Sequence, residues 1–431
     1  MRRLLRILFW GALLCLGAVF LAGTLLLQRT PVLSAAPPPT AEDVAATRKL
    51  VQNIRSAADT VDGTLRTGAN ELNSALRLGA RFIPGFRGKV SIQDAHVIGT
   101  VSIPVPWWDG QRWLNAIGRA PEFEGRIAPS EIFVADYSLP PGLVMEMARI
   151  GANLVLGNAL GDTVLNAAQA MTIEEDALAF RLDLDEMGKN GVMRGTFGAL
   201  KGDSLPTAAE IETFHVMIRE AMETGTLSET GSFLPYLKFT LTAALEGTTP
   251  ETLPGRYTAA ILGLAKACGA KDFALIVGRL VFEKEARPRD NWSTRCVDVT
   301  FNGRIDSRRH FLTSAALQAI SNTGFAVSAG EFKELYDTIS GAGGFDFTDM
   351  TANLSGIRLS NVLMARPAAD WPALLAQLQA EGDVIPSFDG IPQLMPEEEF
   401  KSRFGDIDST AYREMIARIE TRIDALSLYI P

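Results

Sequence analysis

Residues 90–108, VSIQDAHVIGTVSIPVPWW, decide the fold class because apolar and polar or small side chains alternate along them. Val97, Val101 and Ile103 fall on every second position, and this period of two is typical of a half-buried β-strand. The same pattern predicts further strands at 112–118, 122–137 and 177–185.

The residues before this strand have a helical period instead. From Ala41 to Leu78 apolar residues recur at intervals of three and four, until Pro84 and Gly85 end the pattern. We therefore predict one long amphipathic helix packed on an antiparallel sheet, which makes the fold class α+β. The composition resembles that of small envelope domains that hold a lipid or another apolar ligand between a helix and a curved sheet.

The N-terminus carries a membrane signal. Arg2, Arg3 and Arg6 precede a run without charge from Ile7 to Leu27, which is long enough to cross about 30 Å of hydrocarbon as a helix. A secretory signal peptide has a shorter apolar region of about 7–15 residues, so we expect an uncleaved transmembrane helix. The basic residues keep their end in the cytoplasm. The localisation that follows is the inner membrane, single-pass, with the bulk of the chain on the periplasmic side.

The chain is long enough for several folding units. A proline-rich linker is expected after the anchor, and the later residues have mostly helical patterns. The expected segments are the anchor at 1–29, the linker at 30–40, the α+β domain at 41–200, a helical array at 205–286 and a helical domain at 300–431.

Charge and motifs narrow the possible partners. With 50 acidic and 41 basic side chains the net charge is -9, which repels phosphate backbones, so nucleic acid is not an expected partner. The sequence has no nucleophile elbow, phosphate-binding loop, dinucleotide fingerprint or HExxH motif. The expected partners are the cytoplasmic membrane, through the N-terminal helix, and an envelope protein or a lipid ligand.

Two cysteines follow the anchor. Cys268 and Cys296 would lie in a compartment where disulfides persist, so they can pair. Two small buried thiols are the alternative, because spacing alone does not show whether the side chains meet.

The densest polar pattern lies in the C-terminal third of the chain. Glu334 and Asp337 are three residues apart and share one helix face, whereas Asp349 and Asn353 are four apart and share another. If the helices cluster, His310 converges with these acids. An imidazole with carboxylates suits a divalent metal or general acid–base chemistry. The candidate metal ligands and candidate catalytic residues are His310, Glu334, Asp337 and Asp349, with Asn353 and Gly356 in structural positions.

A family resemblance rests on the order of these elements. HF at 310, KE followed three residues later by Asp, and GF-x-F-x-D before a small residue and Gly resemble the YfiM-type envelope lipoproteins, and similar elements occur in the VanZ-like family. The likeness covers residues 304–358 and implies a shared site without a defined reaction. VanZ-like proteins carry the motif on membrane-spanning helices, whereas EFKELYDTI is too short and polar to span. The whole layout also resembles an uncharacterised type of proteobacterial envelope protein.

Other interpretations of the polar pattern stay open. Asp346 or Thr348 can cap a helix, Lys333 with Glu334 can form a solvated face, and the whole group can be a buried structural network. The sequence favours a membrane-anchored binding or scaffold protein of the cell envelope. The alternative is a metal-dependent hydrolase that acts on cell-wall or polysaccharide material. A histidine among acids would have a raised pKa, so such a network would be strongest below neutral pH.

Overall fold

The computed structural model describes eleven stretches of the chain. They are residues 20–21, 23–58, 63–81, 85–107, 110–156, 160–175, 177–183, 205–270, 273, 296–340 and 343–430. Most of the run expected as an anchor, residues 1–19, lies outside them. Within the described stretches no helix combines the length and the apolar character needed to cross a membrane.

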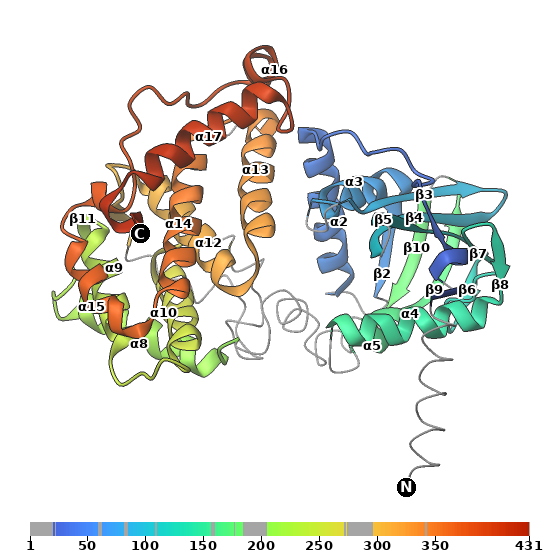
Figure 1. Ribbon diagram of the computed structural model, residues 1–431, viewed down its shortest axis with the longest axis horizontal. Coiled ribbons are helices and arrows are strands. Elements are labelled where there is room, and N and C mark those ends of the chain that lie inside the picture. The colour runs from blue at the N-terminus through green and yellow to red at the C-terminus, as the bar shows by residue number, and fades with distance from the viewer. Residues whose placement is uncertain are drawn as a thin grey trace, which may run out of the picture. The chain divides into compact units, whose positions relative to one another are not determined.

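The described residues form two compact units (Figure 1). The N-terminal unit contains the described parts of 1–39, 43–154 and 161–189, and the C-terminal unit contains those of 40–42, 155–160 and 190–431. The helical segments expected separately at 205–286 and 300–431 thus contribute to one unit.

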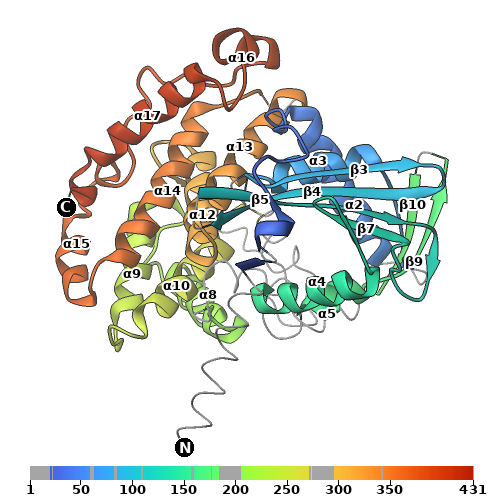
Figure 2. The same ribbon diagram turned by 45° about the vertical axis from the view of Figure 1, so that its right-hand side comes forward.

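Antiparallel sheets define the N-terminal unit. Within its described residues a six-stranded sheet runs in the order β3-β4-β5-β7-β8 with β1 on β5, and a four-stranded sheet runs β2-β10-β9-β6; Figure 2 shows the long strands side by side. The expected combination of helices with an antiparallel sheet is therefore confirmed. The strands are β1 (Leu27–Gln28), β2 (Thr64–Gly68), β3 (Arg87–Gln93), β4 (His96–Trp107), β5 (Gly110–Ala120), β6 (Phe123–Glu124), β7 (Glu131–Val134), β8 (Tyr137–Leu139), β9 (Ala168–Glu174) and β10 (Ala177–Leu182).

The single long helix predicted from Ala41 to Leu78 is wrong. The structure has α2 (Ala41–Ala58), then β2, then α3 (Ala69–Gly79). Gly63, directly before β2, has φ +56°, a conformation that favours glycine and that a continuous helix does not contain. Within β2, side chains at alternate positions are buried, and the strand pairs with β10. This strand contributes Leu65 to a small core with Leu50 and Ala57 of α2.

The strand predicted at 122–137 is also divided, into β6, β7 and the start of β8. Gly125 with φ +90° and Ala135 with φ +53° lie in the connections, and both conformations interrupt an extended strand.

Side chains tie the helices of this unit together. The Asn73 amide of α3 donates to the Val90 carbonyl and accepts from its N–H, both at 2.8 Å, which attaches α3 to β3. Asp43 of α2 accepts from Ser74 at 2.8 Å. Among the described residues this unit also contains α4 (Pro141–Leu156) and α5 (Leu160–Asn166).

Helices build the C-terminal unit. In the described residues they are α8 (Ala208–Glu223), α9 (Leu234–Leu245), α10 (Leu253–Cys268), α12 (Ile305–Ile320), α13 (Thr323–Ser340), α14 (Phe347–Ala365), α15 (Trp371–Gln377), α16 (Glu397–Phe404) and α17 (Thr410–Asp424), with a short parallel pair, β11 (Thr230–Ser232) and β12 (Asp298–Thr300). Helix α10 is buried over most of its length and packs against α8, α9 and α12.

Helices α12 and α14 pack closely at a glycine. A Cβ atom at Gly356 would lie 2.2 Å from the carbonyl oxygen of Phe311, so the space beside it has no room for a side chain. One turn further along α14, Ser360 donates to the Ala315 carbonyl at 2.8 Å. Its hydroxyl also bonds the Tyr257 hydroxyl of α10 at 2.6 Å.

A disulfide joins Cys268, at the end of α10, to Cys296, before β12, with a Cα–Cα distance of 5.2 Å. Of the two alternatives for these cysteines, the structure therefore contains the bonded pair. The buried guanidinium of Arg308 in α12 donates to the carbonyl groups of Cys296 and Val299. The segment after the disulfide is thereby attached to α12.

Candidate metal centre

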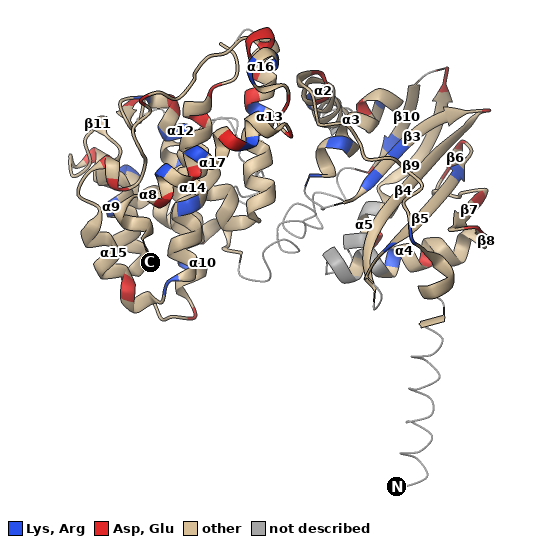
Figure 3. Cartoon of the chain, turned by 45° about the horizontal axis from the view of Figure 1, so that its top comes forward, with Lys and Arg blue, Asp and Glu red and all other residues tan. Residues whose placement is uncertain are grey.

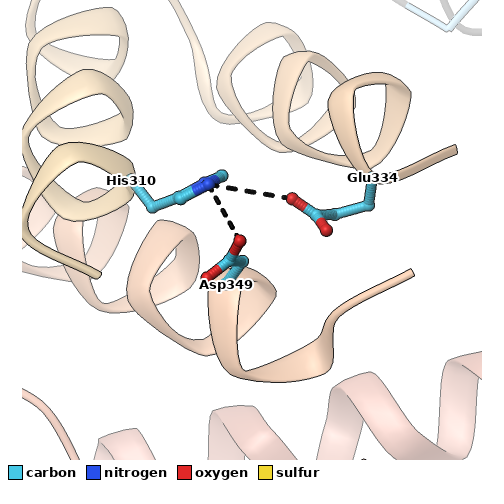
Figure 4. A group of neighbouring side chains, drawn as sticks. All are labelled: His310, Glu334 and Asp349. Carbon is cyan, nitrogen blue, oxygen red and sulfur yellow. Dashed lines mark ion pairs between the residues drawn. The ribbon is translucent and has the colours of Figure 1, made fainter. Parts of the chain in front are cut away.

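Three helices of the C-terminal unit bring together His310 of α12, Glu334 of α13 and Asp349 of α14. Figure 4 shows the three side chains pointing toward one another. The His310 Nε2 atom lies 3.0 Å from Asp349 Oδ2 and 3.9 Å from Glu334 Oε1. The Glu334 side chain is fully buried and that of Asp349 nearly so, whereas 12% of the His310 side chain is exposed.

The His310 ring is held from its other side. Its Nδ1 lies 3.1 Å from the Asn353 side-chain oxygen, which also accepts from the Ser314 hydroxyl at 2.8 Å. An oxygen only accepts, so Nδ1 carries the proton in this bond. Nε2 is then the nitrogen that faces the two acids. Gly330 of α13 leaves the space for Asn353, because a Cβ there would lie 2.6 Å from the amide nitrogen.

Lys333 bridges the acids. Its Nζ lies 3.0 Å from Glu334 Oε1, 3.3 Å from Asp349 Oδ2 and 2.8 Å from Asp337 Oδ2. The lysine side chain is 44% exposed. Lys333 therefore lies on the side of the cluster that faces solvent.

Arg304 and Asp346 hold the start of α14. Asp346 is the N-cap, and its side chain accepts from the N–H groups of Thr348 and Asp349. Arg304 pairs with Asp346 at 3.2 Å and with Asp349 at 3.3 Å. The second oxygen of Glu334 accepts from the Asp346 N–H at 3.1 Å. Glu334 thus links α13 to the first turn of α14.

These contacts and burial shift the pKa values of the two buried acids, Glu334 and Asp349, in opposite directions. Burial raises the pKa of Glu334 to about 7, although His310 and Lys333 act against this change. Burial also acts to raise the pKa of Asp349, but His310, Lys333 and Arg304 outweigh it and lower the value to about 2. Burial opposes a charge on His310, yet Asp349 raises the pKa of its imidazole above the ordinary value. The cluster therefore favours an imidazolium paired with an ionised Asp349.

The donor set also fits a divalent cation. One nitrogen and two carboxylate oxygens from these three residues all lie within 4.8 Å of one another. Two ligand atoms at about 2.0–2.2 Å from a tetrahedral ion are about 3.3–3.6 Å apart. The distance from His310 Nε2 to Asp349 Oδ2, 3.0 Å, would therefore lengthen slightly, and the distance from Nε2 to Glu334 Oε1, 3.9 Å, would shorten slightly. A metal-binding histidine usually donates its other N–H to an oxygen, and Asn353 supplies that oxygen here. Imidazole with carboxylates suits zinc or manganese.

Not all of the expected residues meet at this point. His310, Glu334 and Asp349 form the group, and Asn353 orients the imidazole. Asp337 is not part of the group; it pairs with Lys333 and is 15% exposed.

Sequence reasoning did not assign site roles to Lys333, Arg304 or Ser314. The spacing of Lys333 four residues before Asp337 is a signal for their ion pair, whereas nothing in the local sequence marks Arg304 or Ser314.

Comparisons of the chain with protein-family models, with curated proteins and with solved structures find no match. The geometry of the site is therefore the basis for the functional proposal.

Proposed function

We propose that this protein is a membrane-anchored binding module of the cell envelope and that its C-terminal unit binds a divalent cation through His310, Glu334 and Asp349. The observation that carries the proposal is the convergence of Nε2, Oε1 and Oδ2 from three helices, with the imidazole oriented through its other nitrogen by Asn353. The resemblance of residues 304–358 to YfiM-type and VanZ-like proteins agrees with a shared site at these positions.

Two observations support the envelope location. The run from Ile7 to Leu27 has no charge and is long enough to cross about 30 Å of hydrocarbon as a helix. The Cys268–Cys296 disulfide is of the kind that persists in oxidising compartments such as the periplasm. We place the units on the periplasmic side of the inner membrane.

A second candidate function is hydrolysis of cell-wall or polysaccharide material. Three protein ligands leave a tetrahedral ion with one position for water, as in catalytic zinc sites. The observation that favours hydrolysis is that only three of the described residues converge on the ion, since a fourth protein ligand would close the position that water needs. An apolar ligand for the N-terminal unit remains a prediction from composition.

The experiment is a metal-binding assay on the full-length chain purified in detergent. We expect about one zinc or manganese ion per chain, measured by elemental analysis and titration calorimetry, and loss of that ion in His310→Ala. His96→Ala is the matched control, because His96 is a partly buried histidine at the start of β4, in the N-terminal unit. A wild-type chain that binds neither ion, or a His310→Ala variant that binds as well as wild type, would contradict the proposal.

A further inference from the structure

We propose that Lys333 is the built-in counter-cation of the His310–Glu334–Asp349 site and that a divalent ion enters only by displacing its ammonium group. This inference rests on the proposed function, because it concerns the same site. The convergence of the three ligands does not determine which cation the site holds before a divalent ion binds, and this inference addresses that question.

The ammonium group bonds the oxygen atoms that an ion needs. Lys333 Nζ lies 3.0 Å from Glu334 Oε1 and 3.3 Å from Asp349 Oδ2. These are the same two atoms that face His310 Nε2, at 3.9 Å and 3.0 Å. The lysine charge therefore lies beside the position that an ion would take.

An ion and this ammonium group compete. An ion about 2.0–2.2 Å from each ligand atom draws on the lone pairs to which the lysine donates. Two cations that share two oxygens also repel each other strongly, because the site is mostly buried and screening by water is weak. The oxygens can serve one cation well but not both.

The structure supplies a place for the displaced group. Lys333 also pairs with Asp337 at 2.8 Å, one turn further along α13. The lysine side chain is 44% exposed, and Asp337 is more exposed than Glu334 or Asp349. A long lysine stem can turn its charged end toward water while keeping one ion pair. Asp337 is then a partner for the displaced lysine, not a ligand of the ion.

The experiment compares the affinity of manganese(II) and zinc(II) for four full-length chains in detergent, by titration calorimetry. They are wild type, Lys333→Met, Lys401→Met and His310→Ala. Methionine keeps much of the length of the stem and removes the charge. Lys401 is the matched control, because it lies on α16 and forms the same kind of pair, with Glu397 four residues before it.

We expect Lys333→Met to bind the ion about tenfold more tightly than wild type or better, Lys401→Met to equal wild type, and His310→Ala to lose binding. An equal or weaker affinity in Lys333→Met, with binding still lost in His310→Ala, overturns the lysine proposal and leaves the metal site standing. Binding in Lys333→Met but not in wild type supports the lysine proposal and contradicts the proposed function of the natural chain. No binding in either chain overturns both.

A labelling experiment on the wild-type chain covers the case in which Lys333→Met does not fold. An amine-acylating reagent is applied with and without manganese(II), and modification of each lysine is measured by mass spectrometry. We expect labelling of Lys333 to increase several-fold when the ion is added and that of Lys401 to stay unchanged. Labelling of Lys333 that stays constant or decreases at saturating ion overturns the displacement.

Discussion

Gly356 lies where α14 packs on α12, and a Cβ atom at this position would come within 2.2 Å of the Phe311 carbonyl oxygen. Backbone atoms in two packed helices have little freedom to move aside. We predict that Gly356→Ala lowers the free energy of unfolding by about 3 kcal/mol, as expected for overpacking in a rigid core. Urea unfolding followed by circular dichroism measures this change.

Gly382→Ala is the control for this substitution, since no atom lies within 4 Å of its added Cβ. It should change the free energy of unfolding by less than about 0.5 kcal/mol. Equal effects at the two glycines would show that close packing at Gly356 is not the cause.

The buried titratable residues make stability depend on pH. The pKa of His310 is raised, so its favourable contribution is complete below about pH 6.5 and is lost as the pH rises through its folded-state pKa. The pKa of Glu334 is raised to about 7, so folding becomes less favourable as the pH rises from about 4 to 7. Asp349 acts in the opposite sense, because its pKa is lowered to about 2 and its contribution is lost only below about pH 4.

We therefore predict that the metal-free protein has a higher free energy of unfolding at about pH 5 than at about pH 8, by up to about 3 kcal/mol. Denaturant titrations at a series of pH values measure the difference. Glu334→Gln does not titrate and should flatten the dependence. Wild type that is more stable at pH 8 than at pH 5 would contradict the assigned directions.

Local spacing predicted part of this site. The four-residue interval between Asp349 and Asn353 places both beside His310, where they contact different ring nitrogens. The three-residue interval between Glu334 and Asp337 did not show that only Glu334 faces the histidine. That choice depends on how α13 is rotated against α12 and α14, and such a rotation is set by packing between helices that are distant in sequence.

At the scale of elements, the start of α14 depends on one side chain. Asp346 accepts from the N–H groups of Thr348 and Asp349 and pairs with Arg304. We predict that Asp346→Ala lowers the free energy of unfolding by about 1–2 kcal/mol or more, because it removes a cap and leaves a partly buried guanidinium with fewer partners. Thermal and urea unfolding measure the loss.

Asp370→Ala is the matched control, because Asp370 precedes α15 at the same position but makes no side-chain cap bond. Its effect should remain below about 0.5 kcal/mol. If both substitutions have the same effect, the cap at Asp346 contributes nothing special to α14.

Element boundaries show why the Ala41–Leu78 prediction was wrong. Strand β2 has five residues, and its partner β10 begins at Ala177. Local periodicity does not show that a segment pairs with a strand more than a hundred residues away. The helical spacing of apolar residues on either side of β2 therefore led to the prediction of one continuous helix. Within 90–108 the structure has the end of β3, a turn at Asp94 and Ala95, and β4. The alternation from Val97 to Ile103 was readable because β4 is long and forms hairpins with its neighbours β3 and β5.

At the scale of the whole molecule, α10 explains why the two expected helical domains belong to one unit. This helix is buried on nearly all sides, and a helix that is apolar all round must be covered all round. Its neighbours α8 and α12 come from different parts of the chain. The run AAILGLAKAC carried this signal, but periodicity did not identify the partners. Figure 3 shows acidic and basic positions interspersed over the helices of this unit. This arrangement allows oppositely charged side chains to pair.

The oxidation state of the Cys268–Cys296 pair tests the location of the whole molecule. Disulfides form in the periplasm, whereas cytosolic thiols remain reduced. We predict that in bacterial cells the full-length chain carries this disulfide, and that a chain without residues 1–29 remains in the cytoplasm with both thiols free.

Trapping free thiols with a maleimide, followed by mass spectrometry, measures the two states. Both chains carry Cys15→Ser or lack residue 15, so that only one pair is counted. A full-length chain with both thiols free in a strain that oxidises an exported control protein would contradict the anchor and the periplasmic placement together.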